Sequence, residues 1–384
     1  MKRNFVWIVL SGLMVLSLVL ASCAPAAPVA PTTPTAPTTP TTPTTPTTPT
    51  TPTTPTTPGA ETVKDSLGRL VEKPKYGGTF TYAWFNPPGI LDNAFANRSS
   101  LWVLSLTNEE MLKNDWLKGP SGTGETEFIF PSVKLYEMWT GSLAESWEIP
   151  DKETIIYHIR KGVHWALNPN SEASRLVGGR EFNANDVVST FTRHYNLDGK
   201  TPKAYFYERL VKEEFPLSVT APDKWTVVVK INKGYTSAVM EALSDFQVIY
   251  APEPVAKFGD YRDWKNNVGT GPYMLVDHVE GSSSTFIRNP NYWGKDPLHP
   301  QNQLPYPDAV KMLVIGDRST RMAAFRTGKI DHMGAGRDAL LWDEAVTMRQ
   351  VSPALKELRY PQYDSMNLSL RVDKPELPQY DLRV

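Results

Sequence analysis

The side chains that could carry chemistry in this chain are few, and their spacing does not suit catalysis. No two histidines stand in a His-x-x-x-His spacing, which zinc sites on helices use, and no Gly-x-Ser-x-Gly sequence is present. Adjacent acids, such as Glu109-Glu110 and Glu213-Glu214, usually face water. The sequence therefore predicts no enzymatic activity, no metal site and no cofactor. The histidines are His158, His164, His194, His278, His299 and His332.

Cys23 is the only cysteine of the 384 residues, so it has no partner for an internal disulfide. A basic head at residues 1–4 and an apolar run at 5–20 precede it. That run is shorter than the roughly 20 residues of a membrane span, but it fits a secretory signal. Leu20-Ala21-Ser22-Cys23 resembles a bacterial lipobox, which implies cleavage after residue 22 and acylation of Cys23. An uncleaved anchor with an incidental cysteine is the alternative.

Residues 23–63 read as a stalk. From Pro31 to Pro58 every third residue is proline, mostly in Pro-Thr-Thr repeats. Proline favours the polyproline II helix, which has about three residues per turn, so this tract would extend roughly 80 Å and pack no core. The threonines could carry sugars, but a bare hydrated spacer is the plainer interpretation of this composition. The stalk would hold a globular part away from the membrane surface to which Cys23 is attached.

The composition of the chain limits its partners. Lys and Arg number 40 and Asp and Glu 41, so nothing in the charge favours binding to nucleic acid. The 11 tryptophans and 16 tyrosines suit extracellular recognition of peptides or sugars, as well as an ordinary core. After the apolar run, no later segment is long enough to cross a membrane.

Residue patterns after the stalk predict an α/β fold in which helices flank a mixed β-sheet. Asn183 is expected to cap a helix that has Asp186 in its first turn, and Asp317 to cap another that ends at Gly328. Strands are expected at 79–84, 143–149, 154–160, 215–220, 224–231, 274–279, 285–288, 311–315 and 330–333, and a short helix at 236–243.

Eight phrases, in order over some 300 residues, resemble the family 5 solute-binding proteins of ATP-binding-cassette (ABC) importers. This group includes dipeptide, oligopeptide and nickel receptors. The resemblance implies a lobe of the type II periplasmic-binding-protein fold. Structural roles are enough to explain most of these phrases. Gly162 and Gly271 are expected in tight turns, and Trp147, Trp165 and Trp293 are expected to pack in cores. The phrases are Gly77–Phe80, Leu91–Asp92, Leu143–Glu148, Ile159–Trp165, Phe182–Val188, Val268–Tyr273, Arg288–Gly294 and Thr327–Asp331.

The chain departs from the family at its end. Residues 378–384 resemble the phrase at which family members cross into a second lobe, so residues 64–375 are interpreted as the first lobe and 376–384 as the start of the crossing. We expect the second lobe to be largely missing. Because such receptors enclose solute between two lobes, this chain is expected to bind weakly or not at all and to be marginally stable. A dedicated one-lobed protein is the alternative.

The resemblance also indicates which residues would line the solute cleft. One group follows the first strand: Trp84, Phe85 and Asn86, which offer aromatic faces and an amide. The other comprises Tyr363, Asp364, Ser365, Met366 and Asn367, where Asp364 could meet the amino terminus of a peptide. Loop packing for the aromatic side chains and a strand-end role for Asn367 are equally open.

The function implied is that of a lipid-anchored, extracytoplasmic receptor that delivers a peptide to the permease subunits of an ABC importer. It would be monomeric and lie in the periplasm or at the cell surface. An oligosaccharide, nickel or haem remains open as the solute. A surface adhesion or scaffold lipoprotein is the alternative from another class; the stalk suits it, whereas the ordered phrases do not.

Overall fold

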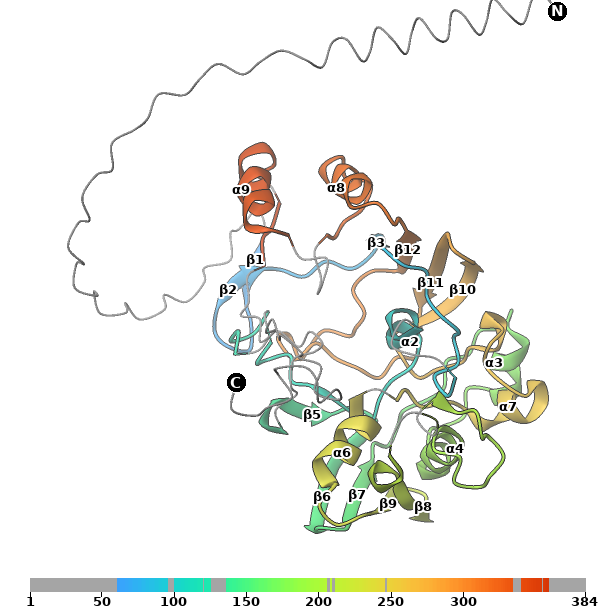
Figure 1. The fold of residues 1–384 in the computed structure, drawn as a ribbon. Coiled ribbons are helices and arrows are strands. Elements are labelled where there is room, and N and C mark those ends of the chain that lie inside the picture. Colours follow the sequence, from blue (N-terminus) through green and yellow to red (C-terminus); the bar gives the residue numbers. More distant parts are fainter. Residues whose placement is uncertain are drawn as a thin grey trace, which may run out of the picture. The chain divides into compact units, whose positions relative to one another are not determined.

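The computed structural model describes residues 61–95, 100–119, 121–125, 136–205, 208, 211–245, 247–333, 340–353 and 355–358. The expected signal, Cys23 and most of the expected stalk lie outside the described residues, as do the expected site residues 363–367 and the expected crossing. Figure 1 shows the order and arrangement of the elements.

One four-stranded sheet is mixed and carries the only parallel pair among the described strands. Its order is β10 (Tyr273–Val279), β11 (Ser283–Arg288), β12 (Ala309–Val314) and β3 (Thr79–Trp84). β12 and β3 run parallel, and the other neighbours are antiparallel. Helix α2 (Leu101–Thr107) packs its buried Val103 and Leu104 into the same core as this sheet. The expected mixed sheet flanked by helices is therefore present.

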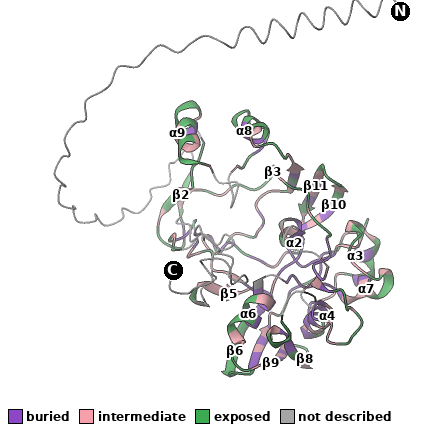
Figure 2. Cartoon of the chain, in the orientation of Figure 1, coloured by how far each residue is buried: buried purple, intermediate pink, exposed green. Residues whose placement is uncertain are grey.

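A second four-stranded sheet, which the sequence did not separate from the first, is antiparallel throughout. Its order is β6 (Ala144–Asp151), β7 (Thr154–Ile159), β9 (Thr226–Ile231) and β8 (Pro216–Asp223). Side chains alternate between the two faces of a strand, so Val227, Val229 and Ile231 point together into the core, as their spacing predicts. Figure 2 shows the buried residues along this sheet and α4.

Shorter elements complete the described part of the chain. Two-stranded ribbons are formed by β1 (Thr62–Lys64) with β2 (Leu70–Glu72) and by β4 (Leu112–Asn114) with β5 (Trp139–Gly141). The remaining helices are α3 (Glu172–Val177), α4 (Ala184–His194), α6 (Thr236–Asp245), α7 (Pro252–Phe258), α8 (Arg318–Arg326) and α9 (Trp342–Val351). Single 3-10 turns are η2 (Tyr136–Met138), η3 (Lys212–Glu214) and η4 (Trp264–Asn266).

Local capping chemistry fixes the starts of the two helices as predicted. Asn183 and Asp186 form a reciprocal capping box at α4, and the Asp317 side chain accepts the Thr320 N–H at 2.7 Å at α8. The expected strand at 330–333 is reduced to an isolated bridge between Tyr82 and His332. Trp165 is fully buried, while Trp147 and Trp293 pack half-buried against the same core.

The two glycines predicted in tight turns serve different purposes. Gly162 has a φ of 76°, where L side chains are strained, as the turn prediction requires. Gly271 instead allows a close approach: a Cβ there would lie 2.8 Å from the Thr107 carbonyl carbon at the end of α2. At Gly269 a Cβ would lie 1.8 Å from the Thr107 oxygen. The phrase Val268–Tyr273, through its two glycines, thus allows the segment before β10 to pack closely against the end of α2.

Replacement of Gly269 by alanine is expected to destabilise the fold by about 3 kcal/mol, because the clash is with backbone that side-chain rotation cannot relieve. Urea unfolding followed by far-ultraviolet circular dichroism measures the loss. Gly316→Ala is the matched control, since its nearest atom, the Phe85 oxygen, would be 3.7 Å from the new Cβ. Equal midpoints for the two variants would contradict the assigned close approach.

Candidate functional site

The first predicted group of site residues lies where the parallel strands β3 and β12 end. Trp84 closes β3 opposite Val314, which closes β12. The loops that follow, residues 85–89 and 315–317, therefore leave the sheet at the same edge. Ligands of α/β proteins commonly bind outside the carboxyl ends of parallel strands, where such loops meet. This edge is the candidate site, and Trp84, Phe85 and Asn86 are called its rim below.

The rim presents aromatic surface beside a polar amide. The Trp84 and Phe85 rings have centroids 4.9 Å apart and planes tilted by 35°, and both residues are partly exposed, whereas Asn86 is exposed. The Ile315 N–H donates to the Trp84 carbonyl oxygen at 2.9 Å, which ties the two loops together. An aromatic pair with an adjacent donor and acceptor can stack on an apolar group while binding an amide.

Sequence reasoning missed one residue that supports the rim. Arg321 on α8 is 3% exposed, and its Nη1 donates to the carbonyl oxygens of Ile315 at 2.6 Å and Gly316 at 2.9 Å. Its guanidinium lies 5.9 Å from the centroid of the Phe85 ring. The two residues are 236 positions apart. No local pattern links them, so only the parallel pairing of β3 with β12 brings them together.

The opposite edge of β3 is held by the segment after α8. Thr81 donates its N–H to an Asp331 carboxylate oxygen at 2.7 Å, and the Asp331 N–H donates to the Thr81 oxygen at 2.6 Å. The rings of Phe80 and His332 are 6.3 Å apart. β3 is therefore bonded on both sides, which fixes the base of the rim.

The loop that continues from the rim is anchored by a buried ion pair. The Asp92 carboxylate accepts two hydrogen bonds from Arg193 on α4, one of them at 2.7 Å, and further bonds from the N–H groups of Tyr261 at 2.9 Å and Ala94 at 3.1 Å. Burial by itself raises the pKa of Asp92, but the hydrogen bonds and charge of Arg193 outweigh it and lower the pKa. Asp92, part of a family phrase, thus links this loop to α4.

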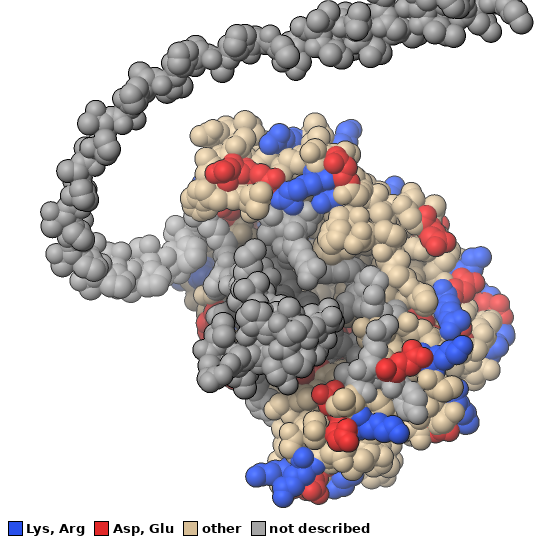
Figure 3. All heavy atoms as spheres, in the orientation of Figure 1, with Lys and Arg blue, Asp and Glu red and all other residues tan. Residues whose placement is uncertain are grey.

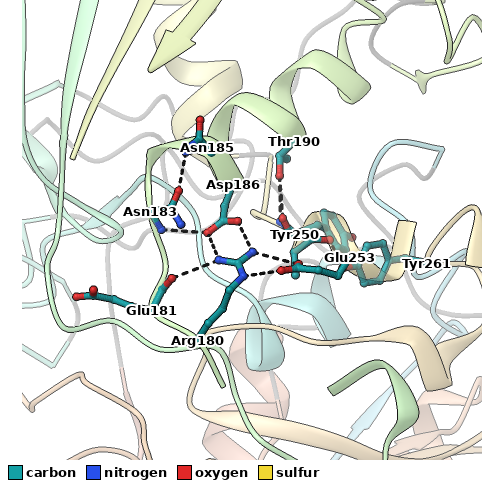
Figure 4. Close-up of polar contacts among 10 residues, drawn as sticks. Arg180, Glu181, Asn183, Asn185, Asp186, Thr190, Tyr250, Glu253 and Tyr261 are labelled. Carbon is teal, nitrogen blue, oxygen red and sulfur yellow. Dashed lines mark hydrogen bonds and ion pairs between the residues drawn. The ribbon is translucent and has the colours of Figure 1, made fainter. Parts of the chain in front are cut away.

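Arg180 ties α4 to α7 in the same way (Figure 4). Its guanidinium donates to both Asp186 oxygens, at 2.9 and 2.6 Å, and to Glu253. Burial alone would lower the pKa of Arg180, but the bonds to the two carboxylates raise it overall. Because Asp186 also accepts the N–H of Asn183, it serves both the helix cap and the ion pair. The cluster therefore joins structural elements to one another.

One predicted solvent-facing acid is buried instead. Glu109 accepts hydrogen bonds from the Trp293 ring N–H at 2.9 Å and the Tyr292 hydroxyl at 3.2 Å. Burial raises the pKa of Glu109 and lowers that of nearby Lys113. The expectation that the adjacent acids face water is therefore wrong for Glu109, because the phrase at 288–294, far along the chain, folds over it.

The described residues contain no cluster of three or more His, Cys, Asp or Glu side chains that could hold a metal ion. In that same part of the chain, no helix has both the length and the apolar character of a membrane span. On the face shown in Figure 3, acidic and basic residues are intermingled over the described surface.

Comparison with known proteins identifies the family. A sequence model described as bacterial extracellular solute-binding proteins, family 5, middle region, matches residues 139–383. Heme-binding protein A of Haemophilus influenzae is 30% identical over 234 residues, 56% of this chain and 40% of that protein. The dipeptide-binding protein of Escherichia coli is 29% identical over 195 residues, 46% of this chain and 36% of that protein. The matches to these two relatives thus span less than half of the length of either.

Solved structures agree on the fold. The periplasmic binding protein DppA from Helicobacter pylori, in complex with the peptide STSA, has a TM-score of 0.54 at 22% identity, covering 72% of this chain and 49% of that one. Haemophilus influenzae OppA, in complex with RPPGFSPFR, has a TM-score of 0.51 at 21% identity, with the same coverage. The expected type II periplasmic-binding-protein fold is confirmed, and the chain belongs to the family 5 bacterial extracellular solute-binding proteins.

Proposed function

We propose that this chain is the solute-binding component of an ABC importer and that its solute is a peptide. The observation that carries this proposal is the family match over residues 139–383. The dipeptide-binding relative and the two peptide-bound structures support the solute class. The rim supports it chemically, because the aromatic faces of Trp84 and Phe85 suit apolar peptide side chains and the Asn86 amide suits a peptide main chain.

The chain by itself is proposed to supply one wall of the binding site. The peptide-bound structures are matched over 49% of their length, and solute enclosed by two lobes loses its water on both sides. One wall leaves half of the solute hydrated, so we expect binding in the millimolar range, near −4 kcal/mol, or none. Residues 64–375 would form this wall, 376–384 the start of the crossing, and residues 363–367 a second group of contacts.

Titration of peptides into the isotope-labelled full chain, followed by NMR, tests the solute class. Di- to pentapeptides at millimolar concentration are expected to shift resonances of Trp84 and Asn86, and Trp84→Ala should abolish the shifts. Trp116→Ala is the matched control, since Trp116 is an exposed tryptophan outside the rim. Shifts with haem, nickel or oligosaccharide alone would refute the peptide assignment; haem is included because of the relative named for it.

Attachment to the membrane is proposed to occur through Cys23, with residues 1–22 removed as a signal and residues 23–63 acting as the stalk. The receptor would then work as a monomer outside the cytoplasm and deliver solute to membrane permease subunits. Expression in bacteria fed a labelled fatty acid tests the anchor: the label should enter the wild-type chain and be absent from Cys23→Ser. Equal labelling of both chains would exclude the assigned site.

A cell-surface pull-down that recovers adhesion partners but no permease would favour the scaffold alternative.

A further inference from the structure

Helix α8, which follows the loop after β12, carries a buried cation that no predicted site included. Arg321, 3% exposed on the second turn of α8, directs one nitrogen to the carbonyl oxygens of Ile315 and Gly316 and lies over the ring of Phe85. We propose that Arg321 is a positioning residue that fixes Phe85, and through the loop also Trp84, in the orientation that meets solute. This inference rests on the proposed function, because it takes the rim to be a solute-contacting wall.

The contacts form a continuous path from α8 to the rim. Ile315 accepts from Arg321 through its carbonyl oxygen and donates its own N–H to the Trp84 oxygen at 2.9 Å. Trp84 and Phe85 then touch through their rings, with centroids 4.9 Å apart. Any shift of the guanidinium therefore acts on the rim in two ways, through the main chain of residues 315–316 and directly on the face of Phe85.

Arginine suits this place better than another residue would. Its rigid planar fork donates to two neighbouring carbonyl groups while its flat face remains available for an aromatic ring. A cation held over a ring attracts it more strongly when the cation is removed from water, and Arg321 is buried although Phe85 is partly exposed. The start of α8 also carries the Asp317 cap, which accepts the Thr320 N–H through its side chain and the Arg321 N–H, at 3.1 Å, through its carbonyl oxygen. The Arg321 side chain thus holds the carbonyl groups of residues 315 and 316, which lead from β12 into α8.

The test uses the full chain labelled with 5-fluorotryptophan and fluorine NMR, with the Trp84 line assigned by Trp84→Phe. Arg321→Met is expected to move and broaden the Trp84 line and leave the line of Trp165, buried in the other core, unchanged. Arg321→Lys, which keeps the charge but not the planar fork, should restore only part of the wild-type position. Arg318→Met is the matched control on the same helix, because Arg318 pairs with Glu344 on α9.

The outcomes separate this inference from the proposed function. A Trp84 line that stays in place in folded Arg321→Met overturns the positioning role, whether or not solute binds. If Arg321→Met does not fold, the milder variant Arg321→Gln replaces it in the test. An unmoved Trp84 line in Arg321→Gln would likewise contradict the positioning role. Where the wild type binds peptide, Arg321→Met should weaken binding about fivefold to tenfold, the effect of one lost cation–ring contact. Shifts of the wild type with haem, nickel or oligosaccharide alone defeat the proposed function, while the Trp84 line still tests Arg321.

Discussion

Replacement of Arg193 by methionine is expected to destabilise the fold by about 3–5 kcal/mol, the usual result of leaving one buried charge without its partner. The Asp92 side chain is fully buried and that of Arg193 is 13% exposed, so water cannot replace the lost guanidinium. Among the described residues, Asp92 would retain the N–H donors of Tyr261 and Ala94. Chemical unfolding at pH 7, followed by circular dichroism, gives the change in free energy of unfolding.

Two further variants show whether the uncompensated charge is the cause. Asp92→Asn combined with Arg193→Met removes the charge but keeps an oxygen that can accept the Tyr261 N–H, so the double variant should be more stable than Arg193→Met alone. Arg262→Met is the matched control: its guanidinium also lies over Phe95, but its side chain is 54% exposed, so its loss should cost below about 1 kcal/mol. A double variant that is no more stable than Arg193→Met would contradict the uncompensated charge as the cause.

Acidification from pH 6.5 to 4 is expected to remove about 3 kcal/mol of stability through His194 alone. Burial first, and then the charge of Arg193, lower the pKa of His194 from 6.5 to about 4. Below pH 6.5 the unfolded chain therefore binds a proton at His194 that the folded chain does not bind. The free energy of unfolding consequently falls with pH until the pKa of His194 in the folded state is reached. The geometry agrees, because Nδ1 contacts the Gln247 side-chain oxygen at 2.9 Å while buried Nε2 lacks an acceptor among the described residues.

His194→Asn isolates this contribution from the other titrating groups. The asparagine amide can still donate toward Gln247, but it does not titrate, so the variant should lose about 3 kcal/mol less than the wild type over that pH range. The comparison is needed because Glu109 acts in the opposite direction: its pKa is raised, mainly by burial, so its protonation on acidification favours the folded state. Unfolding curves at half-unit pH steps provide the measurement, and parallel pH profiles for the two proteins would rule out His194 as the group responsible.

The family, the α/β class and most of the longer elements could be predicted because their signals are local. Asn183 and Asp186 are three residues apart, and they cap α4 whatever the rest of the chain does. The alternation of Val227, Val229 and Ile231 requires only the period of a strand. Trp84, Phe85 and Asn86 were found through the resemblance of the surrounding phrases, and the structure places them at a common sheet edge with residues 315–317.

What the sequence alone determined is thus the local conformation of each segment and the family to which the ordered phrases belong. The tertiary structure decided which distant segments meet: the division into two sheets, the burial of Glu109 beneath Trp293, the Asp92–Arg193 pair, and the support of Phe85 by Arg321. The physical reason is that caps and periodicity act between near neighbours. A contact across 100 or more residues instead depends on the path of the whole chain, so the residues next to either partner do not indicate it.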